Sequence, residues 1–562
     1  MMNKKIESLV FVPLGGLGEI GMNCALYGFG PEKARKWIMV DLGVSFAGDD
    51  LPGIDLIMPD IGFIEKIRKD LLGLIITHAH EDHIGAVAEL WPRLKCPVYA
   101  TPFAAGLLEA KRLMEPNAPD IKVHVVHQGG TFRLGDFGIE FIAVAHSIPE
   151  SCALALHTPV GIVVHTGDWK IDETPMVGRP TDEHRFRALG DEGVLALICD
   201  STNVLREGIS PSETDVAKTL KELVGDAQGR VIVTTFASNV ARLKATADAA
   251  AACGRRVAIV GRAMDRVVQV ARECGYLDGV APFLPAQAAR DIPRKQLVVL
   301  ATGSQGESRA ALARMADDQH PDLKLSTGDR VIFSSRPIPG NEKAINENIN
   351  GLVSQGIEVV TDRTHLVHVS GHPRRAELAR MYEWVRPRIA IPAHGEALHL
   401  SEHAAFAKAQ GVPHVIKARN GDVVLIGEND VVSTPPAVID TVQHGRMLKD
   451  GNQLISFNDE SIAQRRRLSF AGVVSVAMAL TSKGELAGDP DVVFAGIPMR
   501  MAGGAGTDEV IDAAIFATLD NMPRARRRDA DTVVDAIEKS IRSALGQAWG
   551  KKPAVHVLVV EV

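Results

Sequence analysis

The sequence of 562 residues contains no apolar run approaching the roughly eighteen residues that a membrane-spanning helix needs. Its start, MMNKKIESLVFVPLGG, has neither a long apolar core nor a small-residue cleavage site, so no secretory signal is expected. The six cysteines are scattered and form no CxxC pair. We therefore expect reduced thiols in a cytoplasmic protein, and any metal should be held by histidine and aspartate.

An excess of positive charge is also absent, because the formal net charge is −7. This balance argues against a basic coat for nucleic acid over the whole surface, but it leaves room for a local basic groove. Arginines cluster in two places, at Arg465, Arg466 and Arg467 and at Arg524, Arg526, Arg527 and Arg528. A solvated face of a linker or helix is the favoured interpretation of both clusters, and direct RNA contact is the alternative.

Near the start, GLGEIG fits the G-x-G-x-x-G pattern of a dinucleotide site, and Asp41 follows at a suitable distance. That site also needs a helix opening at the last glycine. Instead, MNCALYGF is short, apolar and bounded by turns, and WIMVDLG reads as another strand. Three successive strands predict an antiparallel opening rather than a nucleotide-binding unit.

The most unusual stretch is THAHEDH, at 77–83, directly after the apolar run LLGLII. It places His78, His80, Asp82 and His83 in one loop between an expected strand and an expected helix, IGAVAELWPRL. Imidazole nitrogens and carboxylate oxygens suit zinc or manganese, and one short loop can direct them at two adjacent ions.

Further ligand-type residues follow later apolar strands. His146 follows FIAVA, Asp168 follows GIVVHTG, and His394 follows RIAIPA. His165 lies inside its strand pattern, so we interpret it as a core histidine. The set predicts a dinuclear metal site assembled from strand ends.

These motifs, together with DLG at 41–43, resemble the ordered motifs of the metallo-β-lactamase fold, an αββα sandwich. The resemblance implies two sets of ligands around two ions. The first ion would be held by His78, His80 and His146, the second by Asp82, His83 and His394, and Asp168 would bridge them. Asp41 would orient a ligand histidine from behind.

More than 200 positions separate Asp168 from His394, and strands alternate with helices from VIVTTF to RVIFSS. This rhythm predicts a separate parallel-sheet domain inserted into the sandwich. Beyond it, FAGVVSVAMAL and AVHVLVVEV bracket two helical stretches and predict a small α/β domain. The expected division is 1–210 and 363–450 for the sandwich, 211–362 for the insertion, 451–465 for a polar linker, and 466–562 for the C-terminal domain.

Three stretches indicate which family has such an inserted domain. LALICDSTN with Asp200, HLVHVSGHPRRAEL with His372, and IPAHGE with His394 resemble motifs A, B and C of the β-CASP nucleases. PLGGLGEIGMN, TTFASNVARL, TGSQGE and SSRPIPGNE resemble the bacterial ribonuclease J family, over residues 8–450. PRRAEL departs from the small or polar residues expected after SGH.

The resemblance implies a metal-dependent ribonuclease with two divalent ions, Zn²⁺ first and Mn²⁺ or Mg²⁺ as alternatives. Expected activities are 5′-to-3′ exonuclease action preferring 5′-monophosphate RNA and additional endonuclease action, in rRNA and mRNA maturation and decay. A small-molecule metallo-hydrolase acting on thioesters or lactams is the alternative, although such a substrate needs no inserted domain. A catalytically silent RNA-binding scaffold is disfavoured because all the expected ligands are present.

In the expected mechanism, Asp82 and Asp168 would orient the attacking hydroxide. By the same resemblance, His372 would protonate the leaving oxygen, and Asp200 would hold that imidazole. A pocket for the 5′-phosphate would be formed by Ser238, Asn239, His368, Ser370 and Gly371, with ordinary turn residues as the alternative. Expected partners are single-stranded RNA, further copies of the chain in a homodimer or homotetramer, and other RNA-decay enzymes.

His399 and His403 lie four positions apart on an expected helix, GEALHLSEHAAFAKAQG, a spacing that can bind a metal. They follow the predicted site instead of joining it, so a solvated helix face is the favoured interpretation. His365 is expected to have a core or surface role.

Overall fold

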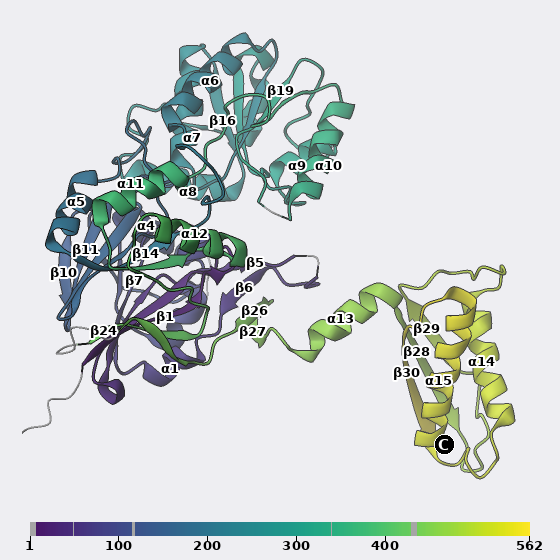
Figure 1. The fold of residues 1–562 in the computed structure, drawn as a ribbon. Helices are drawn as coiled ribbons and strands as arrows, with labels where there is room; N and C mark the ends of the chain where they lie inside the picture. The colour runs from purple at the N-terminus through teal and green to yellow at the C-terminus, as the bar shows by residue number, and fades with distance from the viewer. Residues whose placement is uncertain (1–6, 49, 115–117, 339, 429–434) are drawn as a thin grey trace, which may run out of the picture. The chain divides into compact units, whose positions relative to one another are not determined.

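The computed structural model describes residues 7–48, 50–114, 118–338, 340–428 and 435–562 (Figure 1). Contacts divide the chain into two compact units: Met1–Phe46 with Leu56–Met447, and Ala47–Asp55 with Leu448–Val562. None of the helices within the described ranges combines the length and the apolar character that crossing a membrane requires.

The first unit is built on a sandwich of two mixed sheets. The first sheet has the strand order β25 (Ala437–Thr441), β24 (Asp422–Glu428), β1 (Ser8–Gly15), β3 (Cys24–Gly30), β4 (Lys36–Val40), β7 (Leu71–Ile75), β8 (Val98–Ala100) and β9 (Val123–Val125). The second has the order β10 (Thr131–Leu134), β11 (Phe137–Ala143), β12 (Cys152–Thr158), β13 (Gly161–His165), β14 (Val194–Asp200), β21 (Ile389–Ala393) and β23 (His414–Val415). Both sheets are antiparallel at one side and parallel at the other, and the parallel strands carry the candidate site.

The sandwich core lies between the two sheets. Phe11, Tyr27 and Ile75 from the first sheet pack with Phe141 and Ile198 from the second, all fully or almost fully buried. A second cluster joins the other face of the second sheet to α5 (Glu183–Glu192), α11 (Arg375–Val385) and α12 (Ala397–Ala409). In the first sheet, α3 (Val87–Leu94) and α4 (Pro102–Met114) connect the parallel strands β7, β8 and β9. The predicted αββα fold is therefore confirmed.

The glycine-rich GLGEIG segment opens no helix. It contains the short strand β2 (Leu17–Gly18), which pairs in parallel with β22 (Gly395–Glu396), directly after His394. Strands β1, β3 and β4 run antiparallel to one another, as expected. The glycine-rich turn thus packs beside a predicted metal ligand rather than forming a nucleotide site.

The predicted insertion is a six-stranded, all-parallel sheet with helices (Figure 1). Its strands are β17 (Leu284–Pro285), β16 (Arg256–Val260), β18 (Leu297–Ala301), β15 (Val231–Thr234), β19 (Arg330–Phe333) and β20 (Glu358–Val360), and its main helices are α6 (Glu213–Asp226), α7 (Val240–Ala252), α8 (Arg262–Glu273), α9 (Ala311–Ala316) and α10 (Glu342–Ser354). The inner strands β15 and β18 are buried, largely aliphatic runs, and capping starts the first two helices: Ser212 and Asp215 form a capping box at α6, and the Asn239 side chain caps α7.

In the second unit, β28 (Val473–Leu480), β29 (Asp491–Ala495) and β30 (Ala554–Glu561) form a sheet with α14 (Thr507–Asn521) and α15 (Ala530–Trp549). The segment expected to be a linker, 451–465, is instead regular. It contains β27 (Gln453–Ser456) and the beginning of α13 (Glu460–Ala471). The Asp459 side chain accepts a hydrogen bond from the Ser461 amide (2.9 Å) and so caps α13, which polar composition alone does not reveal.

Candidate active site

The predicted ligands lie at the carboxyl ends of neighbouring strands, where parallel strands present their following loops at one edge. Asp41 follows β4, the HAHEDH loop follows β7, Asp168 follows β13, and His394 follows β21. Strands β13, β14 and β21 are parallel neighbours, so Asp168 and His394 are close in space despite their separation in sequence.

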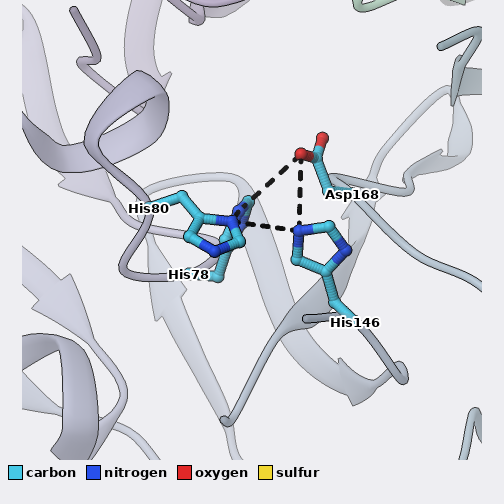
Figure 2. A group of neighbouring side chains, drawn as sticks. All are labelled: His78, His80, His146 and Asp168. Atoms are coloured by element: carbon cyan, nitrogen blue, oxygen red, sulfur yellow. Dashed lines mark hydrogen bonds and ion pairs between the residues drawn. The ribbon is translucent and has the colours of Figure 1, made fainter. Parts of the chain in front are cut away.

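Three histidines and one aspartate form the first cluster, which Figure 2 shows with the side chains turned toward one another. His80 Nδ1 lies 3.2 Å from His78 Nε2 and 3.0 Å from His146 Nε2. Asp168 Oδ2 lies 3.8 Å from His78 Nε2 and 3.7 Å from His146 Nε2. One ligand atom from each residue thus faces a common point.

A second cluster shares Asp168 with the first and adds Asp82, His83 and His394. His83 Nε2 lies 3.5 Å from Asp82 Oδ2 and 3.3 Å from Asp168 Oδ2. His394 Nε2 lies 3.3 Å from Asp82 Oδ2. Because the ligand atoms within each cluster lie within 4.8 Å of one another, each cluster has the spacing of donor atoms around one metal ion.

The hydrogen bonding of the histidines fits metal ligation. His146 Nδ1 donates to the Gly371 carbonyl (2.7 Å), and His83 Nδ1 donates to Asp41 Oδ2 (2.7 Å), so the lone pair of each ring is on Nε2. These Nε2 atoms lie 3.0 Å from His80 Nδ1 and 3.0 Å from the Asn23 side-chain amide. Both ring nitrogens of His394 are buried and face carboxylates, with Nδ1 2.7 Å from Asp168 Oδ1 and Nε2 3.3 Å from Asp82 Oδ2, but neither contact has the geometry of a hydrogen bond. Buried polar atoms left in this way indicate a missing partner, and a divalent cation fits this set of donors.

Electrostatics distinguish the two clusters. Burial lowers the pKa of His78 and His146 well below the ordinary value and that of His80 to about 4, so the first cluster offers neutral imidazoles. In the second cluster burial also disfavours the charged form, but the Asp168 and Asp82 carboxylates outweigh it and raise the pKa of His394 to about 10. The second cluster is therefore a place where the chain favours positive charge.

Asp41 supports this arrangement from behind the ligands. Besides His83, it accepts hydrogen bonds from the Thr77 amide and the Thr77 hydroxyl, both at 2.8 Å. Asp41 and His394 both have left-handed backbone conformations, with φ of 61° and 49°. Such conformations are uncommon outside glycine and concentrate at functional sites.

A third group, at the mouth of the site, pairs His372 with Asp200. His372 Nδ1 donates to Asp200 Oδ2 (2.8 Å), which leaves Nε2 for another partner. Burial lowers the pKa of His372, but Asp200 and Asp168 outweigh this effect, so the pKa is raised above its ordinary value. Asn203, which sequence reasoning did not single out, holds this segment by donating to the Ser370 hydroxyl and the His372 carbonyl.

With this geometry in place, the chain was compared with known proteins. The family models "Metallo-beta-lactamase superfamily", "Ribonuclease J, beta-CASP domain" and "Zn-dependent metallo-hydrolase RNA specificity domain" match residues 22–231, 228–352 and 356–417. Ribonuclease J of Sinorhizobium meliloti is 51% identical over 99% of this chain and 98% of its own length. The chain belongs to the ribonuclease J family. It is a metal-dependent ribonuclease.

Other comparisons agree with this membership. Ribonuclease J of Mycolicibacterium smegmatis is 38% identical over 98% of the chain and 96% of its own length. The family model "Ribonuclease J C-terminal domain" matches residues 460–562, a region that the sequence pattern alone described only as a small α/β domain. A crystal structure of a protein of unknown function from Enterococcus faecalis V583 shares the fold, with a TM-score of 0.52 and 15% identity over 74% of this chain and all of that one.

In this ribonuclease J family member, the predicted phosphate-pocket residues come from two segments. Ser238 and Asn239 form the turn that starts α7, and the Asn239 side-chain oxygen accepts from the Arg242 amide (2.9 Å). Arg242 also donates to the Val367 carbonyl (2.6 Å), which places this turn beside the segment carrying His368. Ser370 and Gly371 lie closer to the ligands, since the Gly371 carbonyl binds His146.

Two other histidines have structural partners. His165 Nδ1 is hydrogen-bonded to the Tyr27 hydroxyl (2.8 Å), in keeping with a core role. The expected solvated position of His403 is wrong, because the residue is fully buried and its ring lies between the Ser201 hydroxyl (2.8 Å) and the Tyr382 hydroxyl (2.9 Å). His399 is half-buried and His365 is exposed.

Proposed function

We propose that the two clusters hold two divalent ions, with zinc as the first choice, and that the chain cuts RNA as a 5′-to-3′ exonuclease with additional endonuclease activity. The observation that supports this most directly is the sharing of Asp168 by both clusters. Two ions bound there would activate a water molecule and neutralise charge on the phosphoryl oxygens. Metal analysis of the purified chain, followed by RNA cleavage with and without chelator, tests the ligand assignment and the choice of zinc.

Asp82 is suited to orient the attacking water. Its side chain is 28% exposed, whereas that of Asp168 is only 2% exposed. A carboxylate at the rim can accept a hydrogen bond from a water molecule while its other interactions hold it in place. Asp168, enclosed by histidines, would serve mainly to keep the two clusters together.

His372 is the proposed proton donor to the leaving 3′ oxygen. The Asp200 carboxylate holds Nδ1 and favours the protonated ring, so that Nε2–H can transfer its proton to the oxygen as the P–O bond breaks. The products would be a 3′-hydroxyl on one fragment and a 5′-phosphate on the other.

The variant His372→Ala tests this role. Loss of a general acid should lower kcat by about 10²–10⁴-fold while both metals stay bound. His365→Ala, which removes an exposed histidine, is the matched control. A variant of His372 that loses metal together with activity would make the residue a ligand and exclude the proton-donor role.

The direction of cleavage depends on the phosphate pocket. Because Asn203 and the His372 amide donate to Ser370 Oγ, the serine hydroxyl can direct its own hydrogen toward a phosphate oxygen. The side-chain oxygen of Asn239 caps α7, which leaves its amide group as a donor. Exonucleolytic rates on 5′-monophosphate and 5′-triphosphate versions of one RNA provide the test, since equal rates would exclude a pocket for the terminal monophosphate.

The proposed activity also indicates the RNA processes and partners in which the chain would take part. An enzyme that prefers 5′-monophosphate RNA is suited to rRNA and mRNA maturation and decay, because earlier cleavage creates that end. We also propose assembly into homodimers or homotetramers, together with contacts to other RNA-decay enzymes. Light scattering of the purified chain at several concentrations tests the assembly, and a monomer throughout would exclude it.

A further inference from the structure

Three arginines that no proposed step uses converge beside the active site. Arg206 follows β14, Arg336 follows β19, and Arg374 directly precedes α11. The amide of Arg375 donates to the Arg206 carbonyl (3.0 Å), which joins the first segment to the third. The Ser334 hydroxyl donates to the Val367 carbonyl (2.7 Å), which brings the end of β19 beside the segment leading to His368 and His372.

These guanidinium groups repel one another. Burial, followed by the charges of Arg336 and Arg374, lowers the pKa of Arg206. Arg336 Nε has a long contact of 3.4 Å to Asp362, whereas Arg206 and Arg374 form no ion pair with any described carboxylate. Arg374 Nε is buried and has no hydrogen-bond partner among the described residues. Three cations facing one carboxylate leave an uncompensated positive charge.

The neighbouring Arg375 differs from these three arginines, because its guanidinium group is engaged in contacts within the fold. Its guanidinium donates to the Val204 carbonyl (2.8 Å) and to Glu402 (3.2 Å), and it lies over the ring of Phe406. Within the PRRAEL stretch that departs from the family pattern, one arginine is therefore fully used by the fold and the other is not.

Aliphatic side chains flank Arg206, Arg336 and Arg374. Leu205 is 46% exposed, Ile209 49%, Ile338 44% and Leu366 39%. A surface that alternates guanidinium groups, of which only that of Arg336 has a carboxylate partner, with exposed apolar side chains fits a nucleic-acid strand, which offers phosphates and base faces in alternation. Because the chain as a whole has a net charge of −7, this patch differs in sign from the average surface.

We propose that Arg206, Arg336 and Arg374 form a binding site for an RNA phosphate group next to the active site, separate from the pocket of Ser238, Asn239, His368, Ser370 and Gly371. This inference rests on the proposed ribonuclease function. The phosphate is a phosphodiester of the strand, because the proposed pocket takes the 5′-terminal group and guanidinium groups bind phosphodiester oxygens well.

The test measures RNA binding by the full chain carrying His372→Ala, in which cleavage is slow. Arg206→Gln, Arg336→Gln and Arg374→Gln are each compared with Arg256→Gln. Arg256 is an exposed arginine at the amino end of β16, at the opposite edge of the sheet from Arg336. Fluorescence anisotropy gives Kd for one RNA sequence with a 5′-monophosphate and with a 5′-hydroxyl, over a series of salt concentrations.

Each of the three substitutions should weaken binding about tenfold, the usual effect of removing a charge-assisted hydrogen bond. The slope of log K against log salt should fall by about 0.7 for each phosphate that the protein no longer neutralises. An equal defect with both RNAs supports a site for the strand. A defect confined to the 5′-monophosphate RNA would place the three arginines in the terminal-phosphate pocket and overturn the separate site. Arg→Lys variants should recover the salt slope but only part of the affinity.

The proposal is overturned if the three variants bind both RNAs like Arg256→Gln, with an unchanged salt slope. Thermal unfolding and metal content identify any variant that fails to fold, and the exposed Arg206 keeps the test open if Arg336→Gln is unstable. The two proposals can fail separately. Absence of cleavage by the wild-type chain with bound metal would count against the ribonuclease mechanism, whereas normal cleavage with unaltered binding by the variants would count against this site alone.

Discussion

His394 and His403 lie nine positions apart, and both are almost or completely buried, with exposed fractions of 5% and 0%. Their rings have opposite surroundings. Both nitrogens of His403 have hydroxyl partners, from Ser201 and Tyr382. The nitrogens of His394 instead lie 2.7 Å from Asp168 and 3.3 Å from Asp82, in contacts that lack the geometry of a hydrogen bond. Burial alone does not separate a ligand from a core residue, but the presence or absence of ordinary hydrogen-bond partners does.

The same distinction applies to the histidines of the first cluster. His165 precedes Asp168 by three positions and is tied to Tyr27, while His78 and His146 present Nε2 toward Asp168. Their other nitrogens are hydrogen-bonded to Thr77 and to the Gly371 carbonyl, which fixes the ring orientation. In three of the ligand rings, those of His78, His83 and His146, one nitrogen is supported by a hydrogen bond and the second is directed toward the metal site.

The most severe way to break the ligand group is Asp168→Ala. This change removes the carboxylate shared by both clusters, so metal content should fall and kcat/KM should drop by about 10³-fold or more. Asp191→Ala, at an exposed aspartate that pairs with Arg386, is the control. Metal analysis and RNA cleavage are measured together, and full metal content with near-normal cleavage would contradict the bridging role.

Gly371→Ala tests the support of His146 from behind. An added methyl carbon would lie 2.5 Å from His146 Nδ1, so the ring or the loop must move. A displacement of about 1 Å in an active site can lower kcat roughly 100-fold. Gly488→Ala, where the methyl group meets open space, should have no effect. If Gly371 served only the phosphate pocket, KM for 5′-monophosphate RNA would rise and kcat would remain unchanged.

Asp41→Asn should have a smaller effect, because the residue acts through His83 and not on the metal itself. The amide keeps the size of the side chain but accepts the His83 hydrogen bond less strongly. Weakening such an outer hydrogen bond typically lowers metal affinity 10–100-fold. Competition with a chelator measures the affinity directly, and an unchanged affinity would mean that the Thr77 hydrogen bonds alone define the role of Asp41.

Much of the site could be predicted from the sequence because its ligands follow apolar strands. The HAHEDH loop after β7, Asp168 after β13 and His394 after β21 are local signals. Parallel strands bring Asp168 and His394 to one edge of the second sheet, and the packing of the two sheets adds the loop after β7 in the first. The family resemblance added Asp200 and His372, whose hydrogen bond joins residues from β14 and from the segment before α11.

The remaining features depend on contacts that no local pattern encodes. The position of His403 could not be predicted because the burial of α12 is decided by Tyr382 on α11 and by Ser201 after β14. The direction of the Gly371 carbonyl, which hydrogen-bonds to His146, likewise cannot be predicted from the sequence SGH. For 451–465, polar composition concealed a helix whose start is marked by Asp459. The domain boundaries and the roles of the site residues remain predictions.

The smallest expected effect is on the pH dependence of stability, and it tests the structural role of His403. Burial lowers its pKa to about 4 in the folded chain, against about 6.5 when exposed. Below pH 6.5, His403 therefore binds a proton in the unfolded chain but not in the folded chain. The free energy of unfolding falls as the pH decreases toward 4. The loss from this residue should begin near pH 7 and reach about 2.5 kcal/mol by pH 4.5. Denaturant unfolding of the wild type and of His403→Gln, which keeps hydrogen-bonding groups without a titratable ring, measures the difference. The variant should show a shallower decrease between pH 6.5 and 4.5, and parallel curves would mean that His403 titrates normally and is not held neutral by its hydroxyl partners.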